Sequence, residues 1–164
     1  MSGAPSYRER LALEGAVLAG SGAIGSAALL AFVDGADDGP WNTIGQLAVV
    51  AALGAWLGPR LVKKWTAAAE PAEGLELSGD PTPLWQLPAI TAGLTLAVAV
   101  PTGMWDAGLR VTGGCLLVGL TQAGVMAPLV AREERRSGRR FVRLPGSRIG
   151  RGTRLGWLAP ATPG

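Results

Sequence analysis

The chain has 164 residues, enough for one compact unit, and 48% of them are hydrophobic, 16% are charged and 25 are glycine. This composition is atypical of a soluble domain and typical of membrane helices that pack through small residues. The chain has no histidine, which removes the commonest zinc ligand, the usual haem ligand and the usual general base. Its one cysteine excludes an intrachain disulfide and a CxxC pair. We therefore expect no metal and no cofactor.

The formal net charge of +3 is unevenly distributed along the chain. Residues 132–164 hold nine arginines and two glutamates, a local charge of +7, whereas residues 66–84 hold four acidic residues and no basic one, a local charge of −4. This segregation indicates that the basic segment and the acidic segment have different surroundings or partners.

The first predicted membrane span covers residues 11–33 and follows a short, polar, basic lead. A cleaved signal peptide is the alternative interpretation of these residues. It is disfavoured because the apolar run is longer than a signal core and lacks a small-x-small cleavage site. Glu14 is the only acidic residue within a predicted span.

An acidic turn rich in glycine, at 34–40, precedes the second span, 41–62, which is uncharged from Trp41 to Pro59. A run of this length without charge is long enough to cross the hydrocarbon core of a bilayer as a helix. Residues 63–83 then form a loop, because their prolines and glycines break helices.

The third span covers 84–105, with Pro88 and Pro101 near its two ends, and a tight turn is expected at 106–109. The fourth span covers 110–131 and the arginine-rich tail, 132–164, closes the chain. The sequence thus predicts an all-α membrane protein of one four-helix transmembrane bundle, 1–131, with an acidic loop at 66–84 and a separate tail.

Basic residues flank the predicted spans on one side, and aspartates lie on the other, where Arg110 is the one basic exception. The positive-inside rule then places both chain ends in the cytoplasm, and we expect the protein in a prokaryotic cell membrane. Tryptophans fall near the predicted boundaries, as interface-seeking rings do.

The two halves of the chain resemble each other. A shift of 69 residues places Gly45 on Gly114 and Pro59 on Pro128, and a shift of 68 places Gly25 on Gly93. This pattern predicts a tandem repeat of a two-helix hairpin, with copies related by an axis along the membrane normal. Chance similarity between helices of low residue diversity is the alternative.

Every predicted span carries small residues four positions apart, which allow close backbone approach between membrane helices. Packing within one monomer and docking of a second copy or another membrane subunit both remain open. The helix-packing candidates are Ser21, Gly25, Gly54, Gly58, Ala89, Gly93, Ala97, Gly119, Ala123 and Ala127.

Three polar residues are candidates for a polar pathway: Glu14, Gln46 and Gln122. An amide in a membrane helix needs hydrogen-bond partners, which a pathway or a neighbouring helix supplies equally well. Glu14 lies about one turn inside the basic end, where it can instead reach the interface or pair with Arg8, Arg10 or Arg60.

The tail is expected to contact anionic lipid or an acidic protein surface, the chain's own acidic loop included. Nucleic acid is disfavoured because the tail contains no known nucleic-acid-binding module. The contact candidates are Arg135, Arg136, Arg139, Arg140, Arg143, Arg148, Arg151 and Arg154.

These patterns favour a non-enzymatic membrane subunit that packs with itself or another membrane subunit and contacts lipid or a partner through its tail. A small oligomeric channel or transporter is the alternative. No grouping of acid, base, nucleophile or metal ligand in the sequence indicates an enzyme.

Overall fold

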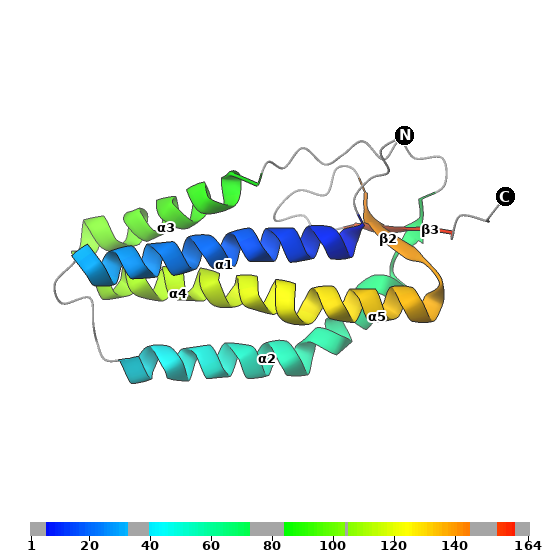
Figure 1. The fold of residues 1–164 in the computed structure, drawn as a ribbon, viewed down its shortest axis with the longest axis horizontal. Helices are drawn as coiled ribbons and strands as arrows, with labels where there is room; N and C mark the ends of the chain where they lie inside the picture. The colour runs from blue at the N-terminus through cyan, green and yellow to red at the C-terminus, as the bar shows by residue number, and fades with distance from the viewer. Residues whose placement is uncertain (1–5, 33–39, 73–83, 104, 145–153, 160–164) are drawn as a thin grey trace.

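The computed structural model describes residues 6–32, 40–72, 84–103, 105–144 and 154–159. Most of them are helical (Figure 1). The elements in chain order are α1 (Tyr7–Phe32), α2 (Pro40–Ala67), β1 (Glu70–Pro71), α3 (Gln86–Thr102), α4 (Trp105–Thr121), η1 (Gln122–Met126), α5 (Ala127–Ser137), β2 (Arg140–Arg143) and β3 (Leu155–Leu158).

Among the described residues, two helices are long and apolar enough to cross a membrane. They are Tyr7–Ala31, with 25 residues, and Ala107–Ser137, with 31 residues. Gln86–Pro101 is a shorter apolar helix. Length and composition are the basis of this assignment, since about 20 apolar residues are needed to span the hydrocarbon core.

The helices fall on the four predicted segments, but two predicted boundaries are wrong. The chain turns at Gly103, whose φ of 65° ends α3 in the left-handed conformation that glycine adopts readily. Residues 106–109 are therefore the beginning of α4 and not a turn. Similarly, α2 continues through Lys63 and Lys64 to Ala67 before the loop begins.

Helices α1 and α4 lie side by side and form the centre of the bundle (Figure 1). Helix α3 packs against both of them, whereas α2 packs mainly along α4, η1 and α5 on the other side. Helices α3 and α4 therefore pack directly on each other, whereas α1 and α2 are separated by α4. The two hairpins of the predicted repeat thus pack differently, and the fold gives the predicted duplication no support.

A π-helical turn, η1, joins α4 to α5 without interrupting the rod. The Ala127 N–H bonds to the Gln122 carbonyl, five residues earlier. Pro128 follows directly and has no N–H to donate, and its ring would crowd the carbonyl four residues before it. A wider turn just ahead of Pro128 relieves that crowding.

A three-stranded sheet lies at one end of the bundle and corrects the all-α prediction. Its strand order is β1-β3-β2, with β1 parallel and β2 antiparallel to β3. In the register, Glu70 pairs with Gly156 and Phe141 with Trp157. The sheet therefore joins the acidic loop to two separate pieces of the arginine-rich tail.

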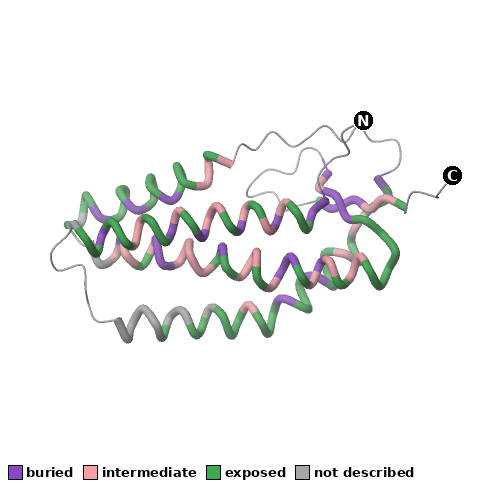
Figure 2. Tube along the Cα trace, viewed as in Figure 1, coloured by how far each residue is buried: buried purple, intermediate pink, exposed green. Residues whose placement is uncertain are grey.

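The main buried apolar cluster lies where this sheet meets the helices (Figure 2). Phe141 and Val130 are almost fully buried there, at 2% and 1% exposure. The cluster draws on α1, α2, η1, α5, β2 and β3 through Tyr7, Leu11, Val62, Met126, Ala127, Val130, Phe141 and Leu155.

Candidate functional site: the helix faces and the charged end

Helices α1 and α4 meet through glycines at backbone-contact distance. A Cβ placed on Gly119 would lie 2.4 Å from the Ala19 nitrogen, and one on Gly22 would lie 2.4 Å from the Leu116 nitrogen. A Cβ on Gly15 would lie 2.7 Å from the Ala123 nitrogen. Such distances leave no room for a side chain, so dispersion contacts between the backbones hold this pair together.

The packing of α1 on α4 and η1 contains three predicted packing residues, Gly25, Gly119 and, in η1, Ala123. It also contains two residues that were not predicted, Gly15 and Gly22. Small residues recur every three or four positions from Gly15 to Gly25, and that longer series would have identified them.

Polar side chains tie the same two helices together near the middle of α4. The Ser26 and Thr112 hydroxyl oxygens lie 2.8 Å apart, and Thr112 is 1% exposed. A Cβ on Gly25 would touch the Thr112 methyl at 2.8 Å. Ser21 instead donates to the Leu18 carbonyl of its own helix, as hydroxyls in membrane helices often do.

Helix α2 packs on the α4–α5 rod through its predicted small residues. A Cβ on Gly54 would lie 2.7 Å from the Thr121 methyl, and one on Gly58 would lie 3.3 Å from both the Met126 sulfur and a Leu129 methyl. Ala127, on the opposing rod, is buried. These three residues therefore lie in the packing of this chain.

Within this chain, the predicted packing face of α3 is not the one that packs. Ala89, Gly93 and Ala97 are exposed, and a Cβ on Gly93 would have no neighbour within 4 Å. The opposite face is buried instead, through Thr91, Thr95 and Ala99. Threonine can occupy that face because its hydroxyl bonds back to its own helix: Thr91 to the Leu87 carbonyl and Thr95 to the Thr91 carbonyl.

Of the three pathway candidates, the structure describes the side chains of Glu14 and Gln122, and they make different contacts. The Glu14 carboxylate lies 2.7 Å from Arg10 Nε and 3.5 Å from Arg143 Nη1, so it joins α1 to the tail. Gln122 lies in η1 and faces α1: a Cβ added to Gly15 would lie 3.0 Å from the Gln122 Cβ. The side chain of Gln46 lies outside the described residues. The Arg10 pair was among the sequence expectations, and the Arg143 pair was not.

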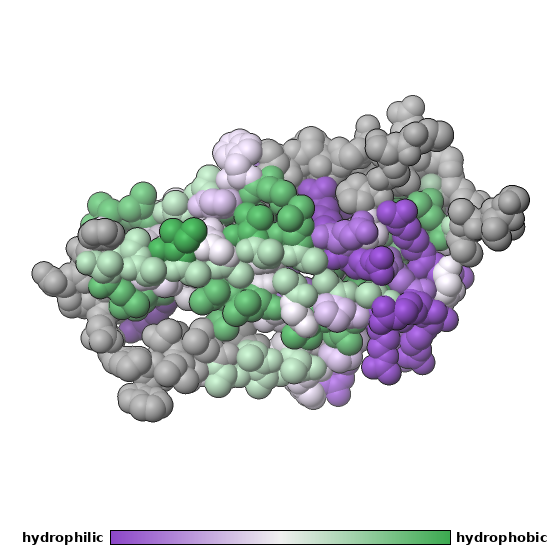
Figure 3. Space-filling model, in the orientation of Figure 1, coloured by the Kyte–Doolittle hydropathy of each residue, from purple (hydrophilic) through white to green (hydrophobic). Residues whose placement is uncertain are grey.

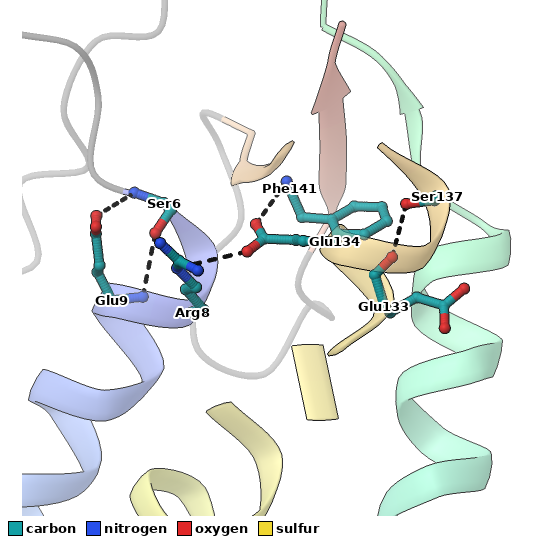
Figure 4. Close-up of polar contacts among 7 residues, drawn as sticks. All are labelled: Ser6, Arg8, Glu9, Glu133, Glu134, Ser137 and Phe141. Carbon is teal, nitrogen blue, oxygen red and sulfur yellow. Dashed lines mark hydrogen bonds and ion pairs between the residues drawn. The ribbon is translucent and has the colours of Figure 1, made fainter. Parts of the chain in front are cut away.

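Glu134 connects the tail to the start of α1 (Figure 4). One of its oxygens accepts the Phe141 N–H at 3.0 Å, and the other pairs with Arg8 Nε at 3.5 Å. Beside it, Ser6 and Glu9 form a reciprocal capping box, in which the Ser6 N–H donates to Glu9 and the Glu9 N–H donates to Ser6 Oγ. The beginning of α1 is thereby fixed against α5 and β2.

The tail arginines occupy several different positions. Arg154 pairs with Glu70 of the acidic loop at 2.7 Å, and Arg139 stacks on the Trp157 ring at 4.3 Å from its centre. Arg140 and Arg143 lie in β2, whereas Arg135 and Arg136 are exposed in the last turn of α5. Arg148 and Arg151 lie outside the described residues. Of the surfaces considered for the tail, the chain's own acidic loop is the one that this fold presents to it.

Large apolar side chains are exposed along the helices, while charge gathers around the sheet (Figure 3). Ile24 of α1 is 73% exposed, Trp56 of α2 is 62% exposed and Val100 of α3 is 60% exposed. A groove of about 600 Å³ between α1 and α3 is also lined mostly by apolar residues, with hydroxyl side chains from Ser21, Thr91, Thr95 and Thr112. Among the described residues, no group of His, Cys, Asp and Glu side chains could hold a metal ion.

Comparison of the chain with protein-family models, with curated proteins and with solved structures found no match.

Proposed function

We propose that this chain is a non-enzymatic integral membrane subunit, a four-span bundle that associates with a second copy or another membrane protein. The single observation that carries this proposal is the exposure of large apolar side chains along the helices. Contiguous apolar surface of this kind is rare on soluble monomers and is the ordinary surface of a protein surrounded by lipid.

The distribution of charge supports one orientation of the helical bundle in the membrane. Arg8, Arg10, Lys63, Lys64 and Arg132 all belong to the helix ends that meet the sheet, as the contacts of α1, α2 and α5 with the sheet cluster show. The positive-inside rule places that end in the cytoplasm of the cell. The sheet then forms a folded cap on the cytoplasmic side, in which the acidic loop and the tail are joined.

The exposed face of α3 is the surface that we assign to association with a membrane partner. Ala89, Gly93 and Ala97 lie four residues apart on that face. Close approach across small residues drives helix association in lipid, and within the part of the chain that the structure describes these three residues are exposed.

Transport is the second candidate function. The ion pairs of Glu14 favour a structural role for this residue over a role in a transport pathway. Two arginines hold that carboxylate at the boundary between the helices and the cap. Pairing of this kind fixes the tail to α1 and gives the carboxylate a structural role.

The test is the mass of the detergent-extracted assembly, with every component identified. We expect a stable assembly larger than one chain, and substitution of Gly93 by Leu should reduce it to the single-chain mass. Gly45→Leu is the matched control, because a Cβ at Gly45 also has no neighbour within 4 Å. A wild-type chain that elutes only as a single copy would refute association.

A further inference from the structure

A pocket of about 520 Å³ lies between the cytoplasmic end of α2 and α5. Both helices contribute apolar and basic side chains to its lining. The apolar ones are Pro59, Val62 and Leu129, and the basic ones are Lys63, Arg132 and Arg136. The same pocket therefore combines a surface for hydrocarbon with a surface for an anion.

Throughout the described residues, no ion pair engages Lys63, Arg132 or Arg136, whereas Arg8, Arg10, Arg143 and Arg154 are all paired with carboxylates. The Glu133 carboxylate also lines the pocket and points toward α2 (Figure 4). The local charge is +2, since three cations face one carboxylate, so an anion is still attracted.

The pocket lies at the depth where a lipid headgroup would be found. In α2, Trp56 is 62% exposed and carries Arg60 stacked on its ring at 4.6 Å, and Trp65 is 36% exposed. Tryptophans at such positions mark the membrane–water interface, and the pocket residues Pro59, Val62 and Lys63 lie between these two rings in the chain.

We infer that this pocket binds an anionic phospholipid. The phosphate lies among Lys63, Arg132 and Arg136, and the start of the acyl chain runs along Pro59, Val62 and Leu129. Glu133 can accept a hydrogen bond from a hydroxylated headgroup such as glycerol. Basic pockets between membrane helices on the cytoplasmic side suit anionic headgroups for these reasons. The inference rests on the membrane location that we propose above.

The test compares two double variants of the full chain in neutral detergent. K63Q/R136Q removes two pocket cations, and K64Q/R135Q removes the neighbouring exposed cations, which do not line the pocket. Binding is measured by the fluorescence anisotropy of short-chain phosphatidylglycerol labelled on its acyl chain. We expect K63Q/R136Q to weaken binding about 30-fold, from about 1 kcal/mol for each basic side chain, and the control to weaken it less than about 3-fold.

A charge-preserving variant, K63R/R136K, should keep the wild-type affinity, which shows that the pocket variant acts through charge. Equal losses in the two Gln variants would mean diffuse attraction and would overturn the site, as would no loss in either. Soluble glycerol phosphate that competes as well as unlabelled short-chain phosphatidylglycerol would overturn the assignment to lipid. Release of the wild-type chain from membranes by alkaline carbonate would refute the membrane proposal itself, whereas retention with unaltered variant binding would refute only this pocket.

Discussion

Gly119 shows, at the scale of single residues, what holds the central helix pair together. A Cβ there would lie 2.4 Å from the Ala19 nitrogen and 2.5 Å from the Gly15 carbonyl oxygen, and neither backbone atom can move without displacing α1. We predict that Gly119→Ala destabilises the folded protein by about 1–3 kcal/mol through overpacking. Thermal unfolding of the purified protein in detergent measures the loss.

Gly114 is the matched control for this substitution. It lies in the same helix, and a Cβ there would have no neighbour within 4 Å. Gly114→Ala should leave the unfolding temperature nearly unchanged. Equal losses in both variants would show that glycine content matters for a reason other than the contact with α1.

At the scale of elements, the tail is a folded part of the molecule that depends on Phe141. This side chain is 2% exposed and lies in the cluster with Tyr7 and Leu11 of α1. We predict that Phe141→Ala weakens docking of the strands by about 3–5 kcal/mol, because it leaves a cavity in the apolar cluster that joins β2 to α1. Limited trypsin digestion measures this as faster cleavage within 139–154.

Phe141→Leu is the control, because it retains most of the apolar volume and should protect the tail nearly as well as the wild-type residue. Cleavage rates that are the same in the wild type and in Phe141→Ala would contradict a docked tail.

The helices could be predicted from the sequence and the sheet could not. Long apolar runs bounded by Gly, Pro and charge define helices locally, so the segments that became α1 to α4 were found. By contrast, β1 has two residues and its partner β3 begins at Leu155, so the pairing depends on contacts far apart in the chain. The Glu14–Arg143 pair, 129 residues apart, was missed for the same reason.

Which face of a helix packs inside the chain was harder to predict than the helix itself. Small residues four apart occur on more than one face of α3, and threonines with satisfied hydroxyls packed inward while Ala89, Gly93 and Ala97 remained exposed. Spacing alone does not distinguish an internal contact from an external one.

At the scale of the whole molecule, the arrangement predicts that the charged cap lies wholly on the cytoplasmic side. In a Cys115→Ala background, Ser137→Cys marks the cap end of α5, where residue 137 is exposed. Asp38→Cys marks the acidic segment between the first two helices. A membrane-impermeant maleimide added to intact cells should label Asp38→Cys and leave Ser137→Cys unlabelled, because the four-span arrangement that we propose would put these residues on opposite sides.

Permeabilised cells supply the control, since both variants should then be labelled to the same extent. Labelling of Ser137→Cys in intact cells would reverse the orientation and would put the basic pocket of Lys63, Arg132 and Arg136 outside the cell. The binding test in neutral detergent is independent of this result, because no membrane surface potential acts there. A reversed orientation together with intact phosphatidylglycerol binding would therefore mean that the pocket binds its lipid by direct contact, in the leaflet opposite to the one whose surface potential attracts basic side chains.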